Sequence, residues 1–257
     1  MTGDDHVLAR DLAGQAGQRL LELRAQGGDP DVLRKAGDRL SHEFLTAALA
    51  GQRPGDVVLS EEGADNPARL GARRVWIVDP LDGTREFGEP GRTDWAVHVA
   101  LWEKGDVSGP GDLTAGAVAL PAQDQVLSTA EPPAPLPEDA ASGRVRIVVS
   151  RSRPPSFVRN ISGLISAELV PLGSAGAKVA AVICGEVDAY VHGGGFYEWD
   201  TAAPVAVARA AGLHASRIDG SALAYNQPDL LMPDILVCRP ALAGILLQAI
   251  REVTHAP

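Results

Sequence analysis

Two aspartates follow an apolar run near the end of the first third of the chain. The run at residues 74–78 (Arg-Val-Trp-Ile-Val) is short and rich in β-branched side chains, which predicts a strand. Asp79 stands at its carboxyl end, a proline then fixes the direction of the backbone, and residues 82–84 (Asp-Gly-Thr) predict a turn into the start of a helix. The fold must therefore bring a strand end and a helix start together, with two carboxylates between them.

This arrangement favours a metal ion next to an anion. Two adjacent carboxylates repel each other unless a cation lies between them, and ligands that are all oxygen atoms favour Mg²⁺ over zinc. The backbone N–H groups of Gly83 and Thr84 would point at an anion, as those at helix amino termini do for phosphate groups. The alternative is a plain turn, with Asp79 as a solvated strand end.

Two other segments place acids at comparable positions. Glu61 and Glu62 follow a strand-like run at 56–60, and Asp200 opens a helical run at 200–211 with a proline in its first turn. Alone, a pair of glutamates usually marks a solvated loop, and an aspartate at a helix start is usually a cap. Together with the central motif they predict one acidic site.

In this order, the three motifs resemble those of the inositol monophosphatase superfamily, magnesium-dependent and lithium-sensitive phosphomonoesterases. The superfamily combines an acidic pair after a strand, Asp-Pro-(Ile/Leu/Val)-Asp-Gly-Thr, and Trp-Asp-x-Ala-Ala-Pro, which match Glu61-Glu62, residues 79–84 and residues 199–204. The resemblance covers nearly the whole chain and includes Gly173-Ser174. Residues 85–87 (Arg-Glu-Phe) are similar to the CysQ-type 3′(2′),5′-bisphosphate nucleotidases, which act on 3′-phosphoadenosine 5′-phosphate.

The resemblance implies ligands for two Mg²⁺ ions and leaves a third ion open. Glu61, Asp79 and the backbone carbonyl of Leu81 would hold one ion. Asp79, Asp82 and Asp200 would hold the other, so that Asp79 bridges the two.

The resemblance also implies catalytic groups. Thr84, hydrogen-bonded to an acid, would orient the attacking water, Asp38 would lie near that water, and Glu61 is the third catalytic candidate. Substrate contacts are expected from four side chains and from the backbone of the central turn: Arg85, Arg151, Lys178, Asp200, Gly83 and Thr84.

Several of these substrate contacts have a plain alternative. Arg151 and Arg153 could grip a second phosphate, but a solvated basic loop explains them equally well. Lys178 is as readily explained as a surface lysine. Glu198 and Trp199 are candidates for contact with the base or ribose, although Trp199 also suits a core position. His98 and His192 are given no role.

The rest of the chain predicts a mixed α/β fold, α+β in the first half and α/β in the second, which the resemblance places in a layered αβαβα sandwich. A Pro-rich stretch at 131–143 is the predicted linker between a first subdomain, 1–130, that carries most metal ligands, and a second, 144–257, that carries Asp200 and the substrate contacts. Helices are expected at 5–26, 31–50, 155–166, 174–185, 200–211 and 240–254. Strands are expected at 56–60, 74–78, 94–103, 113–120, 124–129, 146–150, 168–172, 187–192 and 235–239.

Composition limits the partners. A net charge of −10 disfavours a nucleic-acid polymer but allows a small phosphorylated ligand, because a bound cation reverses the local field. Without a signal peptide or an apolar run long enough to span a membrane, the chain is expected in the cytoplasm, with Cys184 and Cys238 as buried thiols. A homodimer is left open.

These observations predict a magnesium-dependent phosphomonoesterase that converts 3′-phosphoadenosine 5′-phosphate to AMP and phosphate during sulfate assimilation. The alternatives are an inositol monophosphatase or a fructose-1,6-bisphosphatase of the same fold, and, in another class, a non-catalytic regulator that binds phosphate or metal. Retention of Thr84 beside the motif acids argues against the regulator, which has no need of a hydroxyl that positions water.

Overall fold

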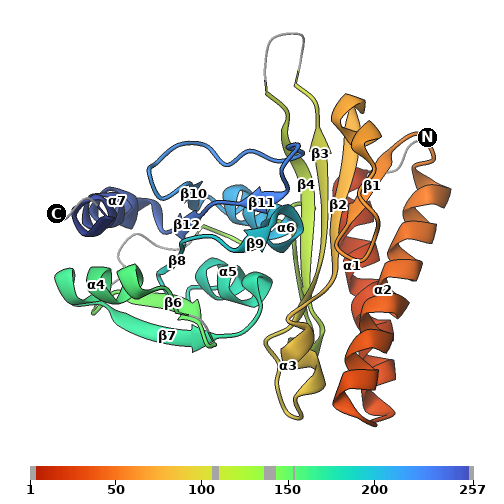
Figure 1. Cartoon of the computed structure of the whole chain (residues 1–257), viewed down its shortest axis with the longest axis horizontal. Helices are drawn as coiled ribbons and strands as arrows, with labels where there is room; N and C mark the ends of the chain where they lie inside the picture. The colour runs from red at the N-terminus through yellow and green to blue at the C-terminus, as the bar shows by residue number, and fades with distance from the viewer. Residues whose placement is uncertain (1–3, 106–109, 136–142, 153, 255–257) are drawn as a thin grey trace.

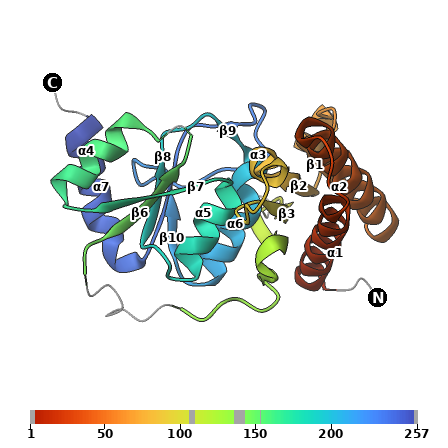
Figure 2. The ribbon, with the colours of Figure 1, turned by 90° about the horizontal axis from the view of Figure 1, so that it is seen from below.

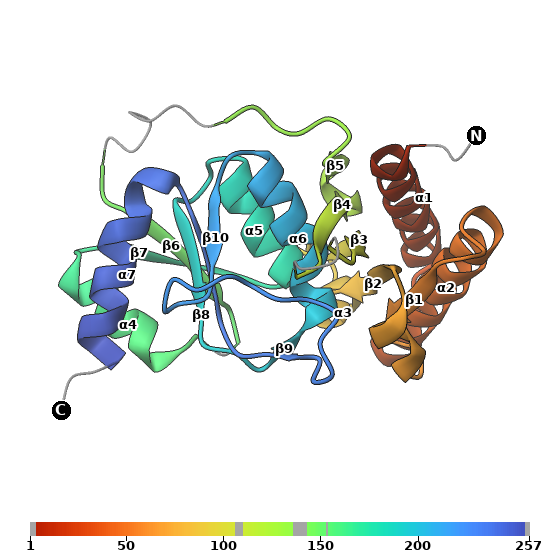
Figure 3. The same cartoon turned by 90° about the horizontal axis from the view of Figure 1, so that it is seen from above.

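The computed structural model describes residues 4–105, 110–135, 143–152 and 154–254, and in them five layers follow one another (Figure 1). Helices α1 (Asp5–Ala25) and α2 (Pro30–Gln52) form one outer layer. A first sheet, helices α5 (Ala175–Ile183) and α6 (Glu198–Ala210), and a second sheet come next. Helices α4 (Ser156–Leu164) and α7 (Pro240–Thr254) close the other side (Figures 2 and 3). The predicted αβαβα layering is confirmed.

The two outer helices at the amino terminus begin and end at the expected signals. Asp4 and Asp29 cap α1 and α2 through their side chains, because each accepts hydrogen bonds from backbone N–H groups in the first turn. Gly27 and Gly28 follow α1 with φ values of +68° and +127°, which glycine adopts without strain. The chain can therefore turn sharply between the two helices.

The first sheet has five strands in sequence order, with β1 and β2 parallel and the others antiparallel. Its strands are β1 (Val57–Ser60), β2 (Arg74–Asp82), β3 (Ala96–Glu103), β4 (Asp112–Leu120) and β5 (Gln125–Ser128). Strand β2 is buried on both faces. Trp76 and Val78 pack toward α1 and α2, whereas Val75 and Ile77 pack toward α5 and α6. This burial explains why its sequence is a continuous apolar run.

The second sheet has the strand order β10-β12-β8-β6-β7. Its strands are β6 (Arg146–Ser150), β7 (Glu168–Leu172), β8 (Ala189–His192), β10 (His214–Ser216) and β12 (Ile235–Cys238). β6 pairs in parallel with β7 and β8, and β12 is antiparallel to β8 and β10. A separate pair is formed by β9 (Phe196–Tyr197) and β11 (Leu231–Met232). The sequence did not predict β9, β10 or β11, because segments of two or three residues carry no readable period.

Residues 129–145 connect the two sheets, and 136–142 of this connection lie outside the described residues. One hydrophobic cluster joins Val75 and Ile77 of the first sheet, α5 and α6, and Val148 and Val237 of the second. The two predicted subdomains thus share packing, and their boundary stays a prediction.

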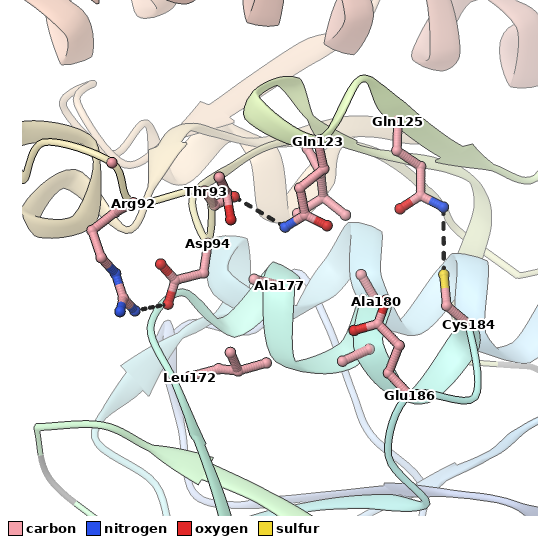
Figure 4. Close-up of a pocket in the computed structure, with 13 residues that line it drawn as sticks. Arg92, Thr93, Asp94, Gln123, Gln125, Leu172, Ala177, Ala180, Cys184 and Glu186 are labelled. Carbon is pink, nitrogen blue, oxygen red and sulfur yellow. Dashed lines mark hydrogen bonds and ion pairs between the residues drawn. The ribbon is translucent and has the colours of Figure 1, made fainter.

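The structure corrects one expectation about the cysteines. Cys238 is buried, but Cys184 is exposed because it caps the carboxyl end of α5. It borders a cavity of about 360 Å³ between α5 and the β4–β5 turn, where Gln125 Nε2 lies 3.4 Å from Cys184 Sγ (Figure 4). Within the part of the chain that the structure describes, every helix is too short or too polar to cross a membrane.

Candidate active site

The end of β2 is distorted where the two motif aspartates stand. The pairing of β2 with β3 shifts register between Asp79 and Asp82, and such a bulge changes where side chains point. Gly83 follows with φ +83°, and a Cβ there would lie 3.0 Å from Ser174 Cβ and 3.2 Å from the Asp94 carbonyl oxygen. Only glycine fits both the backbone conformation and the space, after which α3 (Thr84–Gly88) begins.

Three carboxylates converge at this point. Asp79, Asp82 and Asp200 each offer an oxygen atom, and these atoms lie within 4.8 Å of one another. Asp200 reaches the cluster from the first turn of α6, where its Oδ2 accepts a hydrogen bond of 2.6 Å from Tyr197 N. The strand end and the helix start are thus brought together as the sequence predicts.

Asp79 is the member that fits a metal ion most closely. Its Oδ1 accepts a hydrogen bond of 3.0 Å from Leu81 N. Its Oδ2 is buried and receives no hydrogen bond from any residue in the described ranges. A buried carboxylate oxygen without a partner is costly, and a cation removes that cost. The donor set, made only of oxygen atoms, suits a hard divalent ion.

Asp82 is hydrogen-bonded to the start of α5 and lies beside a histidine of β3. Asp82 Oδ2 accepts hydrogen bonds from Ser174 Oγ (2.5 Å) and Gly176 N (2.6 Å). His98 Nε2 lies 3.3 Å from the same oxygen, and burial lowers the pKa of this histidine. A Cβ on Gly176 would lie 2.0 Å from His98 Nε2. The sequence reasoning gave His98 no role and missed this support, since only the fold brings β3 and α5 together.

The fourth acid stands at the end of the neighbouring strand. Because β1 and β2 are parallel, the backbone N–H of Glu61 donates to the Val78 carbonyl, which places Glu61 beside Asp79. Glu61 lines the cavity in front of the cluster, and although the residue as a whole is exposed, its carboxyl group lies within hydrogen-bonding reach of Asp79. It is not one of the three converging acids.

Burial and mutual repulsion change the charges of this site. Both effects raise the pKa of Asp79 well above its ordinary value, with Glu61 and Asp82 as the nearest sources of repulsion. Burial, and next the charge of Asp82, raise the pKa of Asp200 to about 7. Loss of hydration together with the neighbouring acids raises the pKa of Glu61 to about 7. A site that disfavours its own negative charge in this way is suited to a cation.

These shifts predict how the stability of the chelator-treated protein depends on pH. Glu61 and Asp200 titrate near pH 7 in the folded protein and near pH 4 when unfolded, so the folded protein binds more protons between these values. Its free energy of unfolding must therefore fall as the pH rises through this window. We expect Tm in chelator to fall by about 5 °C or more from pH 5.5 to 8.

Saturating Mg²⁺ should remove most of this fall of Tm with rising pH. The Asp200→Asn variant in chelator should show a smaller fall than the unmodified protein. Scanning calorimetry at several pH values measures both. Equal slopes of Tm against pH with and without Mg²⁺, and in the variant, would contradict a metal site at these acids.

Thr84 and Asp38 meet at the edge of the cluster. Thr84 Oγ1 lies 2.9 Å from the Leu81 carbonyl oxygen and 3.3 Å from Asp38 Oδ1, which comes from α2. Burial, and next the charge of Glu62, raise the pKa of Asp38 to about 6. The hydroxyl group is thus fixed between a backbone carbonyl and an acid that changes protonation near neutral pH.

A cavity of about 840 Å³ opens in front of the acids. Gly83 and the exposed Arg85 line it, and so does Lys178. The surface alternative for Lys178 is wrong, because its side chain is only 5% exposed and Nζ donates to the carbonyl oxygens of Gly173 (2.6 Å) and Ser174 (2.7 Å).

Of the two arginines predicted to bind a second phosphate, Arg151 and Arg153, the structure describes only Arg151. Arg151 Nη2 donates to Glu86 Oε1 at 2.7 Å and to Glu89 Oε1 at 3.0 Å, and the residue does not line the cavity. Arg153 lies outside the described residues. Arg151 is therefore an ion-pair partner of the segment after the central motif in this structure.

Glu198 and Trp199, the candidates for contact with the base or ribose, do not line the cavity. Glu198 is fully buried, and its two carboxylate oxygens accept hydrogen bonds of 2.7 Å from the backbone N–H groups of Asn226 and Gln227. Trp199 does not line the cavity, whereas Tyr197 does. The sequence reasoning missed Tyr197. The sequence signal was an aromatic residue two positions before Trp199, whereas the exposure of its side chain comes from the structure.

Comparison with known proteins gives matches over nearly the whole chain. The model of the inositol monophosphatase family matches residues 8–255. The 3′-phosphoadenosine 5′-phosphate phosphatase of Mycobacterium leprae is 51% identical over 97% of this chain and 94% of its own length. The 3′(2′),5′-bisphosphate nucleotidase CysQ of Escherichia coli K12 is 30% identical over 84% of this chain and 91% of its own.

Solved structures give the same fold. Inositol monophosphatase II of Staphylococcus aureus superposes with a TM-score of 0.79 at 22% identity, over 96% of this chain and 95% of that one. CysQ of Bacteroides thetaiotaomicron superposes with a TM-score of 0.77 at 28% identity, over 91% of this chain and 97% of that one. The mixed α/β architecture is therefore shared with these proteins.

Proposed function

The chain belongs to the inositol monophosphatase family, and on that premise we propose that it hydrolyses the 3′-phosphate of 3′-phosphoadenosine 5′-phosphate. The products are adenosine 5′-phosphate and inorganic phosphate. Relatives at 51% identity carry the name of this phosphatase. The observation that carries the proposal is the convergence of Asp79, Asp82 and Asp200 next to a cavity of about 840 Å³, which Asp82 and Asp200 line.

The metal ligands in this proposal are the acids of the cluster and one carbonyl. Glu61, Asp79 and the carbonyl oxygen of Leu81 would hold one Mg²⁺, and Asp79, Asp82 and Asp200 would hold a second. Support comes from the buried Asp79 Oδ2, which receives no hydrogen bond from the described residues, and from the raised pKa values of the acids. Bound there, divalent ions lower the pKa of water and neutralise charge on the phosphate group.

The protein groups around the attacking water are Thr84 and Asp38. The Thr84 hydroxyl orients the water by accepting a hydrogen bond from it, and Asp38 accepts the proton that the water loses. The water oxygen then bonds to phosphorus, the bond from phosphorus to the ribose O3′ breaks, and O3′ takes up a proton from solvent, to which Asp38 later releases the proton that it accepted. An acid with a pKa of about 6 is suited to this role near neutral pH.

Substrate binding in this proposal uses both walls of the cavity. Arg85 would face the spectator 5′-phosphate, and the buried Lys178, whose pKa is lowered by burial, lines the cavity beside the cluster. Binding of a phosphate oxygen by the N–H groups of Gly83 and Thr84 stays a prediction. Arg151 contributes by fixing Glu86 and Glu89 beside Arg85. We also propose that the enzyme acts in the cytoplasm on this small substrate, with a homodimer left open.

A comparison of two substrates tests this assignment. The value of kcat/KM should be about tenfold to a hundredfold higher for adenosine 3′,5′-bisphosphate than for inositol 1-phosphate, because the spectator phosphate adds charge-assisted contacts worth about 1.5–3 kcal/mol each. Phosphate release in Mg²⁺ measures both values.

Arginine variants test the cause of this preference. Arg85→Ala should reduce the ratio of kcat/KM for adenosine 3′,5′-bisphosphate to kcat/KM for inositol 1-phosphate. Arg39→Ala is the matched control, because this exposed arginine on α2 pairs with Glu43 and does not line the cavity. Equal or faster turnover of inositol 1-phosphate by the unmodified enzyme would reject the nucleotidase assignment.

A further inference from the structure

We propose that Tyr197 determines substrate class by stacking on the purine base, an inference that rests on the proposed nucleotide activity. The residue lines the same cavity as Asp82 and Asp200, at the start of α6. Its neighbours in sequence, Phe196 and Glu198, are both buried. Tyr197 is 46% exposed, which is unusual for a large aromatic side chain and leaves part of its ring available to a ligand.

The backbone of Tyr197 is fixed directly to the acidic cluster. Its N–H donates a hydrogen bond of 2.6 Å to Asp200 Oδ2, and Asp200 is one of the three converging acids. Strand β9, which contains Tyr197, also pairs with β11, so that Tyr197 lies opposite Leu231. The backbone of Tyr197 is therefore held beside the acids at which the 3′-phosphate would be hydrolysed, and a base separated from that phosphate by one ribose would lie nearby.

The ring of Tyr197 is supported on one face. It stacks on Trp199 with a centroid separation of 4.9 Å and an interplanar angle of 17°. Tyr197 lines the cavity and Trp199 does not, so the tyrosine is the member of the stacked pair that a ligand in the cavity can reach. A ring that already has one stacked neighbour loses little side-chain freedom when a second planar ring stacks on it.

The cavity beside Tyr197 leaves room for a flat ligand. Residues 193–195 are three glycines that line it, so this part of the wall is bare backbone. A Cβ on Gly195 would meet no atom within 4 Å, whereas one on Gly193 would lie 2.8 Å from Phe157 Cε1. The aromatic ring and the glycine segment together favour a planar base over the puckered, hydroxyl-bearing ring of inositol.

Kinetics on two substrates test this role. Removing the ring in Tyr197→Leu should lower kcat/KM for adenosine 3′,5′-bisphosphate by between about fivefold and about a hundredfold, the range for the loss of one stacked base. The loss should appear mainly in KM. Turnover of inositol 1-phosphate, which has no base, should be unchanged, and Tyr197→Phe should behave as the unmodified enzyme.

A binding measurement separates this inference from the hydrolytic activity. In calorimetry with Mg²⁺, Tyr197→Leu should weaken binding of adenosine 5′-phosphate but not of ribose 5-phosphate. Leu231→Ala is the matched control, because Leu231 is 48% exposed on the paired strand and does not line the cavity. It should change neither affinity.

Two results would overturn the inference. Tyr197→Leu could weaken both ligands and slow both substrates equally, which would show a structural role, or it could leave the nucleotide values unchanged. An unmodified enzyme that does not hydrolyse the nucleotide would instead reject the proposed function, and with it the premise of the stacking role.

Discussion

Replacing Asp79 with asparagine is expected to lower kcat at least about a thousandfold at saturating Mg²⁺. The proposed role of Asp79 is to bridge two ions, and the change removes that charge at nearly constant shape. Losing about 4 kcal/mol of transition-state stabilisation corresponds to a factor of about a thousand. Phosphate release from adenosine 3′,5′-bisphosphate measures the effect.

The same variant should be more stable than the unmodified protein in chelator at pH 8. Ionisation of Asp79 is unfavourable in the metal-free protein, because burial and the neighbouring acids raise its pKa well above the ordinary value. An asparagine keeps an oxygen for the bond from Leu81 N and removes the charge on the oxygen that receives no hydrogen bond from the described residues. We therefore expect a higher Tm together with a nearly inactive enzyme.

Asp124→Asn is the control for a general effect of losing an aspartate. This residue is exposed on the turn before β5, with φ +53°, a conformation that asparagine also tolerates. Its kcat and its Tm should match those of the unmodified protein. An Asp79→Asn variant that keeps a tenth of the original kcat would contradict the role of Asp79.

Replacing Thr84 with valine is the second change with a large expected effect. Valine keeps the shape of the side chain but has no hydroxyl to orient the water, so kcat should fall about 10²- to 10⁴-fold. Thr84→Ser keeps the hydroxyl and should retain most of the activity. Steady-state kinetics with adenosine 3′,5′-bisphosphate measures both variants.

The affinity for Mg²⁺ separates the proposed role of Thr84 from a structural one. Thr84→Val should bind Mg²⁺ as the unmodified protein does in calorimetry, since Thr84 is not among the proposed ligands. Loss of Mg²⁺ binding in this variant would show that the hydroxyl supports the metal site through its contact with the Leu81 carbonyl oxygen. A variant with unchanged kcat would reject the role of Thr84 altogether.

Most of the fold could be predicted because its elements are long and bury regular patterns. Strand β2 appears as one apolar run because Trp76 and Val75 are buried on opposite faces of the same sheet. Helices α1 and α2 are delimited by Asp4, Asp29 and the glycines after α1. The short pair β9–β11 escaped prediction because pairing to a distant segment, rather than local periodicity, defines it.

The candidate site was predictable where its residues belong to sequence motifs and unpredictable where tertiary packing decides. Asp79 and Asp82 belong to one motif, but their contacts with His98 and Gly176 depend on how β3 and α5 meet. The surface alternative for Lys178 failed because a lysine on a helix is usually exposed, whereas here its Nζ donates to two carbonyl groups inside the protein.

A buried hydrogen-bond network around Glu198 was also unreadable from the sequence. Arg69 is 1% exposed, and its Nη1 donates to Asn226 Oδ1 at 2.9 Å, although the two residues are 157 positions apart. Asn226 in turn donates its backbone N–H to Glu198, beside the cluster acid Asp200. These contacts join three separate segments, and no sequence pattern within any one of the segments predicts them.

Product analysis of 3′-phosphoadenosine 5′-phosphate hydrolysis tests the central claim most directly. Chromatography of the reaction mixture should show adenosine 5′-phosphate and inorganic phosphate in equal amounts when Mg²⁺ is present, and neither product when a chelator replaces it. Formation of adenosine 3′-phosphate, or turnover that persists in the chelator, would contradict a metal-dependent 3′-phosphatase built on Asp79, Asp82 and Asp200.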